Sequence, residues 1–146
     1  STRIRELLAE GDVASAADML GSYWCVDGIV EKGAERGARM GFPTANTRLE
    51  NGAALSHGIY AVRITIDGSR YQGAAYLGTR PTFDSGAPLL ETFVFDFNGN
   101  LYGKKIRVEF IEHIRADAKF KSVDDLVKQM TIDCEKARNI LAHAKP

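Results

Sequence analysis

The residues best suited to chemistry stand in one short run, Gly41-Phe42-Pro43-Thr44-Ala45-Asn46. Pro43 fixes its own φ and disfavours helix at Phe42, so we expect an extended segment here. Side chains alternate along an extended chain, which points Thr44 and Asn46 the same way. A hydroxyl and an amide oxygen suit Mg²⁺, a hard ion that takes few protein oxygens and fills its shell with phosphates and water. The run therefore indicates a site for a magnesium nucleotide.

A segment rich in glycine and arginine leads into this run. Glycines let the main chain approach a ligand closely, and arginines supply cationic forks that suit phosphate. The residues that we assign to the nucleotide here are Gly33, Arg36, Gly37, Arg39 and Gly41. Two other interpretations stay open: the glycine-arginine segment is a solvated turn, and Pro-Thr-x-Asn is a turn with side-chain-to-backbone bonds. The chain contains neither a Walker A loop nor Gly-x-Gly-x-x-Gly.

A second candidate is a carboxylate on an aromatic strand. One face of the stretch from Leu89 to Phe97 carries Glu91 among apolar and aromatic side chains. Burial disfavours the charged form of a carboxylate unless it is paired, and such conditions are those of a general base. The alternative is that Glu91 lies at the mouth of the strand, exposed or paired with an arginine. Asp96, on the opposite face, is interpreted as structural.

Aromatic and cationic side chains near the end of the chain suit a planar ligand. Tyr102 follows the Asn98-Gly99 turn, and Arg115 and Phe120 flank the link to the last helix. Stacking and cation–π contacts would hold an aromatic ring there, although each residue could equally lie on a rim. No catalytic Ser-His-Asp or Cys-His set can be argued, and we assign no role to either His57 or His113.

The elements that must position these residues are mainly strands. Hydrophobic periodicity predicts strands at 23–32, 58–66, 71–77, 89–97 and 105–115, with a hairpin at Asp67-Gly68. Short strands separated by regular turns favour a closed or nearly closed antiparallel barrel over a βαβ fold. Helices are predicted over 2–10 and 13–20, the second capped by Asp12.

A last helix should cover the barrel. Ser122 and Asp125 resemble a capping box at its start. Its apolar stripe comprises Val123, Leu126, Val127, Met130, Cys134, Ala137 and Leu141.

Composition limits the class of protein. The 146 residues are 45% hydrophobic and 26% charged, and the 19 basic and 19 acidic residues balance to a net charge of zero. This balance disfavours nucleic acid or a membrane surface as a partner. With no long apolar run and no signal peptide, we expect a cytoplasmic protein whose two cysteines, Cys25 and Cys134, are buried or inert. The opening Ser-Thr-Arg-Ile-Arg, without methionine, reads as part of something longer.

Taken together, these motifs resemble the riboflavin kinase family, and more narrowly the kinase module of the bacterial bifunctional riboflavin kinase/FAD synthetase. The resemblance runs from about Tyr23 to the end. Its pieces are Gly33-x-x-Arg36-Gly37-x-x-x-Gly41-Phe42-Pro43-Thr44-Ala45-Asn46, Gly58-Ile59-Tyr60-Ala61, Gly78-Thr79-Arg80-Pro81-Thr82-Phe83, Glu91 with Asp96-Phe97, Leu101-Tyr102-Gly103, and Arg115 to Phe120 with the following helix.

The resemblance implies a mainly β fold: a six-stranded antiparallel Greek-key barrel with a short N-terminal helical segment and a C-terminal helix. It implies a riboflavin kinase domain at 23–146, preceded at 1–22 by a helical remnant or linker from an adenylyltransferase module. That module, the FAD-forming half of the bifunctional enzyme, would be missing from this chain. The implied activity is transfer of the γ-phosphate of ATP to the ribityl 5′-hydroxyl of riboflavin, giving FMN and ADP.

The same resemblance assigns roles to residues. Thr44 and Asn46 would bind Mg²⁺ and phosphate, and Glu91 would be the base. The nucleotide would also meet the 33–41 loop, Phe42, Pro43 and Tyr102, whereas the flavin would meet Arg115, Phe120 and Leu126.

The sequence departs from the family pattern at three places. Tyr76 stands where many members carry asparagine, Phe93 where they carry histidine, and Ala116-Asp117 where a Pro-Glu pair is common. A competing hypothesis is a flavin- or nucleotide-binding regulatory module with little turnover alone. The intact set of Thr44, Asn46 and Glu91 favours the enzyme.

Overall fold

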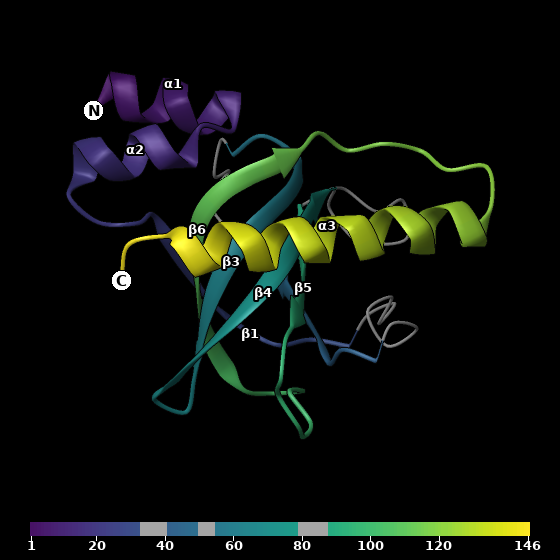
Figure 1. Ribbon diagram of the computed structural model, residues 1–146. Helices are drawn as coiled ribbons and strands as arrows, with labels where there is room; N and C mark the ends of the chain where they lie inside the picture. Colours follow the sequence, from purple (N-terminus) through teal and green to yellow (C-terminus); the bar gives the residue numbers. More distant parts are fainter. Residues whose placement is uncertain (33–40, 50–54, 79–87) are drawn as a thin grey trace.

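Six antiparallel strands form one curved sheet with a long helix across its outer face (Figure 1). The computed structural model describes residues 1–32, 41–49, 55–78 and 88–146. In chain order the elements are α1 (Thr2–Glu10), α2 (Val13–Leu20), β1 (Cys25–Ile29), β2 (Thr44–Arg48), β3 (Gly58–Ile66), β4 (Ser69–Gly78), β5 (Leu89–Val94), β6 (Lys105–Arg115) and α3 (Val123–His143).

The strand order is β1-β6-β3-β4-β5-β2, with every neighbouring pair antiparallel. Strands β3, β4 and β5 follow one another, and β6 returns to lie beside β3, which is a Greek key. The two end strands approach each other: Glu31, just after β1, forms an isolated bridge with Asn46 of β2, its N–H donating to the Asn46 carbonyl at 2.7 Å. The sheet is thus a nearly closed barrel, as the sequence predicted.

The tight turn between β3 and β4 shows how local sequence sets the register. Asp67 and Gly68 both have positive φ, 50° and 82°, the combination that a two-residue hairpin needs to match strand twist. Residues then pair from Ile66 with Ser69 through to Gly58 with Leu77. The register that this turn begins reaches the candidate site at the far end of both strands.

The apolar side chains form two layers of core. The barrel interior is filled by large residues such as Tyr60 and Ile64 of β3, Leu77 of β4, Leu90 of β5 and Phe110 of β6. The second layer lies between the sheet and α3 and contains Phe93, Phe95, Met130, Cys134 and Leu141 among others. Burial of Cys134 raises the pKa of its thiol to about 12.

The N-terminal helices form a hairpin beside β6, at one end of α3 (Figure 1). Leu7, Leu8, Val13 and Ala16 are buried in the interior cluster, so the hairpin extends the barrel core. The Leu8 carbonyl also accepts from the Ser56 N–H at 3.0 Å. In the part of the chain that the structure describes, no helix is both long and apolar enough to cross a membrane.

Several expectations need correction. Strand β5 ends at Val94 rather than Phe97, because Asp96 takes a positive φ of 58° that ends the extended chain. Val123 is exposed rather than part of the buried stripe, since it lies in the first turn of α3, beyond the sheet. Cys25 is exposed rather than buried.

Candidate active site

The candidate site is built on one row of side chains that crosses five strands. Asn46 of β2 pairs with Glu91 of β5, Glu91 with Tyr76 of β4, Tyr76 with Ile59 of β3, and Ile59 with Arg115 of β6. Directly paired residues project from the same face of a sheet, and neighbouring strands lie about 4.8 Å apart. Residues up to 56 positions apart in the chain, Ile59 and Arg115, thus become lateral neighbours on the outer, α3-facing surface.

Gly58 helps to place the β6 end of this row. A side chain at Gly58 would put its Cβ 2.3 Å from the Arg115 carbonyl oxygen, and its φ of +143° is one that other residues rarely adopt. Only glycine lets β3 start this close to Arg115.

Thr44 and Asn46 carry the strongest sign of a ligand. Asn46 is 1% exposed, and the side-chain oxygens of both residues are buried without a hydrogen-bond partner among the residues described. Both residues lie on β2 rather than in a turn, so the alternative of side-chain-to-backbone turn bonds is wrong for them. A buried oxygen that lacks a partner costs free energy, which a cation or a phosphate group with its metal would recover. The pair therefore fits Mg²⁺ chemically.

Glu91 lies beside this pair and is fully buried. Its exposure is 0%, so the alternative of an exposed Glu91 is wrong, whereas the alternative of a Glu91 paired with an arginine stays open. Its neighbours on the sheet are Asn46 on one side and Tyr76 on the other. Within the described ranges no three His, Cys, Asp or Glu side chains gather as metal ligands.

A polar cleft opens on one side of the β2–β5 pair. It has a volume of about 650 Å³ and lies between residues 30–32, the Phe42-Pro43-Thr44 run and the 99–102 turn. Lys32 places its Nζ 5.4 Å from the centre of the Tyr102 ring, which is 56% exposed. An ammonium group beside an exposed aromatic ring suits an anionic ligand with a planar ring.

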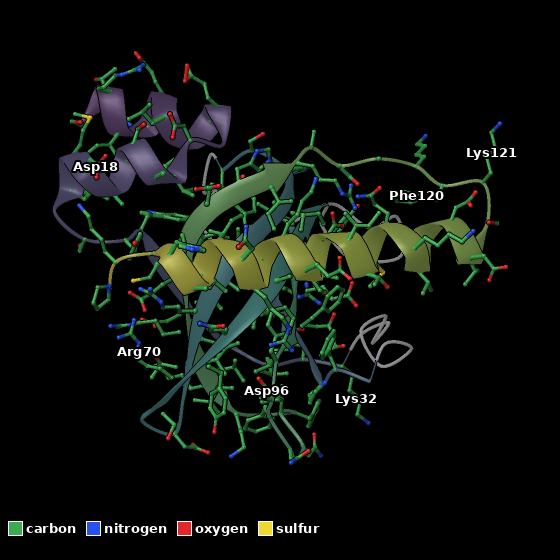
Figure 2. The ribbon with its side chains drawn as sticks, in the orientation of Figure 1. Asp18, Lys32, Arg70, Asp96, Phe120 and Lys121 are labelled. Atoms are coloured by element: carbon green, nitrogen blue, oxygen red, sulfur yellow. The ribbon has the colours of Figure 1, made fainter. Side chains whose placement is uncertain are left out.

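A second, mainly apolar pocket of about 390 Å³ opens on the other side. Its floor is the outer face of β3, β4 and β5, and its walls are α3 and the 116–122 loop that joins β6 to α3. Figure 2 shows Phe120 and Lys121 on that loop, with Lys32 on the opposite side of α3. The lining residues are Ile59, Ala74, Ala75, Tyr76, Phe93, Arg115, Ala118, Phe120, Lys121, Ser122, Val123, Leu126, Met130 and Asp133.

The two clefts meet at the β2–β5 pair. Thr44, which lines the polar cleft, pairs directly with Phe93, which lines the apolar pocket, and the next pair on the same face is Asn46 with Glu91. Asn46 and Glu91 line neither cleft and are buried beside the Thr44–Phe93 pair. The structure thus makes the predicted metal residue Asn46 and the predicted base Glu91 neighbours on the sheet, and it gathers the predicted ring-binding residues Arg115, Phe120 and Leu126 around the apolar pocket.

The structure describes only some of the other predicted site residues. Gly33, Arg36, Gly37 and Arg39 lie outside the described residues. Gly41, Phe42 and Pro43 are described, and Phe42 packs on Phe95 with ring centres 5.0 Å apart. Arg115, Phe120 and Leu126, assigned to one ligand, do line one pocket.

Sequence reasoning missed three residues at these clefts. Tyr76 and Asp133 line the apolar pocket, and Lys32 lines the polar cleft. Asp133 had a readable signal, because it lies between Met130 and Cys134 on the apolar stripe of the last helix. Lys32 had none, since a lysine at the end of a predicted strand is ordinary.

The fold and the paired clefts define a Greek-key barrel with two adjoining clefts and a buried carboxylate on the β2–β5 pair beside them. Comparison with known proteins narrows this class: residues 20–141 match the family model for riboflavin kinase. The chain therefore belongs to the riboflavin kinase family.

Curated relatives agree. A bifunctional riboflavin kinase/FMN adenylyltransferase from Haemophilus influenzae is 42% identical over 139 residues, covering 94% of this chain and 45% of that protein. The enzyme of the same description from Bacillus subtilis is 38% identical over 141 residues, with the same coverage. The chain thus spans just under half the length of these relatives.

Solved structures resemble the fold. A Streptococcus pneumoniae protein described as a macrolide-efflux protein superposes with a TM-score of 0.85 at 38% identity, over 95% of this chain and 46% of that one. Riboflavin kinase from Trypanosoma brucei superposes with a TM-score of 0.58 at 20% identity, over 82% of this chain and 77% of that one, which supports the fold alone.

Proposed function

We propose that this chain transfers the γ-phosphoryl group of ATP to the ribityl 5′-hydroxyl of riboflavin, giving FMN and ADP. The observation that carries the proposal is the β2–β5 pairing, in which Thr44 of the polar cleft lies opposite Phe93 of the apolar pocket and the next pair on the same face is Asn46 with Glu91. Family membership and the description of the relatives as riboflavin kinases support the choice of substrates.

Glu91 is the general base in this proposal. It takes the proton of the 5′-hydroxyl as that oxygen bonds to the γ-phosphorus, while the bond from the γ-phosphorus to the bridging oxygen breaks and ADP leaves. Phosphoryl transfer needs little covalent help from a protein, so positioning and one base supply most of the catalysis. The burial of Glu91 keeps water away from this proton transfer.

Thr44 and Asn46 would hold Mg²⁺ through their otherwise unsatisfied side-chain oxygens. The bound ion would neutralise charge on the β- and γ-phosphates. The nucleotide would occupy the polar cleft, with its ring near Tyr102 and its phosphates near Thr44. The Gly33, Arg36, Gly37, Arg39 and Gly41 segment and the Phe42-Pro43 pair remain part of this proposed nucleotide site.

The flavin would occupy the apolar pocket. Its ring would lie among Phe120, Leu126 and the Arg115 guanidinium, with the ribityl chain directed along the sheet row toward Glu91. A pocket that is mainly apolar with a few polar groups suits a large heteroaromatic ligand.

We also propose the division of the chain into a kinase domain at 23–146 and a helical linker at 1–22 that follows an adenylyltransferase module. The bifunctional description of the relatives supports it, because this chain covers less than half of each. The 146 residues should then form FMN but no FAD. Two unpaired cysteines and ATP as substrate suit the cytoplasm of a bacterium.

Incubation with riboflavin, ATP and Mg²⁺, followed by chromatographic separation of FMN from FAD, tests the proposal. FMN alone is the expected product. Folded protein that quenches riboflavin fluorescence but forms no FMN would instead support a flavin-binding module, and folded protein that neither binds nor converts riboflavin would overturn the assignment.

A further inference from the structure

Asp133 is an almost fully buried carboxylate on the apolar face of α3. Its side chain is 3% exposed and accepts four hydrogen bonds. Arg115 donates from Nε to both oxygens at 3.0 and 3.1 Å and from Nη2 to Oδ2 at 2.8 Å, and Gln129 donates from Nε2 to Oδ1 at 3.1 Å. The pair is a two-pronged arginine–carboxylate contact with an amide as its support.

These contacts occupy the hydrogen-bond donors of Arg115. Its remaining terminal nitrogen, Nη1, donates to the Ala116 carbonyl at 3.1 Å, so all three guanidinium nitrogens donate within the protein. Its Cζ lies 5.6 Å from the centre of the Phe120 ring, within cation–π range. The Arg115 guanidinium therefore has a fixed position at the pocket, where its cation–π contact holds the Phe120 ring in place.

The loop that carries Phe120 is fixed at a second point. The Tyr76 hydroxyl donates to the Asp117 carboxylate, which ties the loop to β4. The Tyr76–Asp117 bond thus joins the loop to the sheet. The Arg115–Asp133 pair joins the start of the loop to α3, and Arg115 also binds the Ala116 carbonyl. Ala118 and Phe120, which follow these two attachments, line the apolar pocket.

We propose that Asp133 is a positioning residue for the flavin ring. Through Arg115 it holds Phe120 at the wall of the apolar pocket, and so it sets the affinity for riboflavin without taking part in phosphoryl transfer. The inference rests on the proposed function, because it takes riboflavin as the ligand of this pocket. Asp133 borders the pocket, but both of its oxygens are occupied by Arg115 and Gln129.

Asp133→Asn keeps the size of the side chain and removes the charge that pairs with Arg115. We expect the riboflavin Kd, measured by fluorescence quenching, and the riboflavin KM to rise about tenfold, the scale of coupling between contacting groups. The KM for ATP and kcat should stay within about twofold, because Arg115, the partner of Asp133, stands at the opposite end of the sheet row from Asn46, with Ile59 and Tyr76 between it and Glu91. A rise in both KM values, or a fall in kcat alone, would overturn the inference.

The chain offers a matched control on the same helix. Arg138 pairs with Asp96 at 3.5 Å and places its Cζ 4.3 Å from the Phe95 ring, but this pair is exposed and lines neither cleft. Asp96→Asn suits the positive φ at that position, which asparagine tolerates. It should leave the riboflavin Kd unchanged.

A double-mutant cycle distinguishes positioning from general loosening of the fold. In a Phe120→Leu background, Asp133→Asn should change the riboflavin Kd less than about twofold, because the ring that it holds is gone. Full additivity of the two changes would overturn the inference. If Asp133→Asn does not fold, Gln129→Leu removes one of the four bonds and should raise the riboflavin Kd about threefold, and no change would count against the proposal.

The wild-type protein separates this inference from the proposed function. FMN formation by the wild type with an unchanged riboflavin Kd in Asp133→Asn refutes the positioning role alone. Riboflavin binding that weakens in Asp133→Asn, with no FMN formed by any variant, supports the positioning role and refutes the kinase assignment. Absence of riboflavin binding in the wild type refutes both.

Discussion

At the scale of single residues, the side-chain oxygens of Thr44 and Asn46 point to a ligand, because they are buried and have no hydrogen-bond partner among the described residues. Burying a polar atom without a partner costs about 1–3 kcal/mol, and here two such atoms lie on one face of β2 beside Glu91. A protein keeps such a cost where a bound group recovers it. The arrangement is therefore read as a binding site rather than as part of the core.

Asn46→Ala tests the metal role. Removing the amide oxygen should raise the Mg²⁺ concentration for half-maximal FMN formation by at least about tenfold, since even indirect metal contacts cost that much. The measurement is the initial rate across a Mg²⁺ titration, with the exposed Asn139→Ala as control. An unchanged titration in Asn46→Ala would remove this residue from the metal site.

At the scale of elements, the strand starts and turns decide where the site residues lie. Gly58 lets β3 begin against the Arg115 carbonyl, and the Asp67-Gly68 turn sets the β3–β4 register that carries Tyr76 next to Glu91. The site thus depends on backbone geometry well away from its functional groups.

Gly58→Ala should destabilise the protein by about 2–5 kcal/mol, from backbone strain plus a forced shift of β6. Gly21→Ala is the matched control, because Gly21 also has positive φ, at 79°, but has no atom within 4 Å of the added Cβ. It should cost about 1 kcal/mol. Chemical denaturation measures the free energy of unfolding of both variants. Equal losses would show that the contact between the added Cβ and the Arg115 carbonyl does not add to the cost.

His113 predicts a pH dependence at the junction of β6 with the N-terminal hairpin. Burial lowers its pKa below the ordinary 6.5, only partly offset by a backbone bond at His57. The unfolded chain therefore binds the proton first as pH falls, so this contribution to stability is complete above about pH 7 and is lost as pH falls through the folded pKa. His113→Gln should flatten the stability profile below about pH 7. Parallel profiles for wild type and His113→Gln would contradict this.

The sequence predicted those parts of the structure that local rules determine. Both N-terminal helices have their predicted bounds, because Asp12 and the glycines that follow each helix act locally. Strand β5 was extended too far because alternation continues to Phe97, whereas the positive φ of Asp96 that stops it leaves no trace in periodicity. A carboxylate on the apolar stripe marks Asp133 as unusual in the sequence, but its role depends on a pairing with Arg115, 18 residues away, that only the tertiary structure reveals.

At the scale of the whole molecule, the barrel brings two unlike clefts to one buried carboxylate. The polar cleft lies toward β1 and β2, the apolar pocket lies under α3, and the β2–β5 pair separates them. The net charge of zero gives no long-range attraction, so recognition depends on the clefts themselves. We place the phosphoryl transfer beside Glu91, where the two clefts adjoin.

The most direct test of this placement compares single-turnover FMN formation by wild type and Glu91→Gln, with riboflavin affinity measured by fluorescence quenching in the same samples. Glutamine keeps the shape of the side chain but cannot accept the proton of the 5′-hydroxyl. For Glu91→Gln we predict a rate of FMN formation about a hundred- to ten-thousandfold lower than that of the wild type, with a riboflavin affinity within about twofold of the wild-type value. A variant that still forms FMN at the wild-type rate, or that loses binding and turnover together, would contradict it.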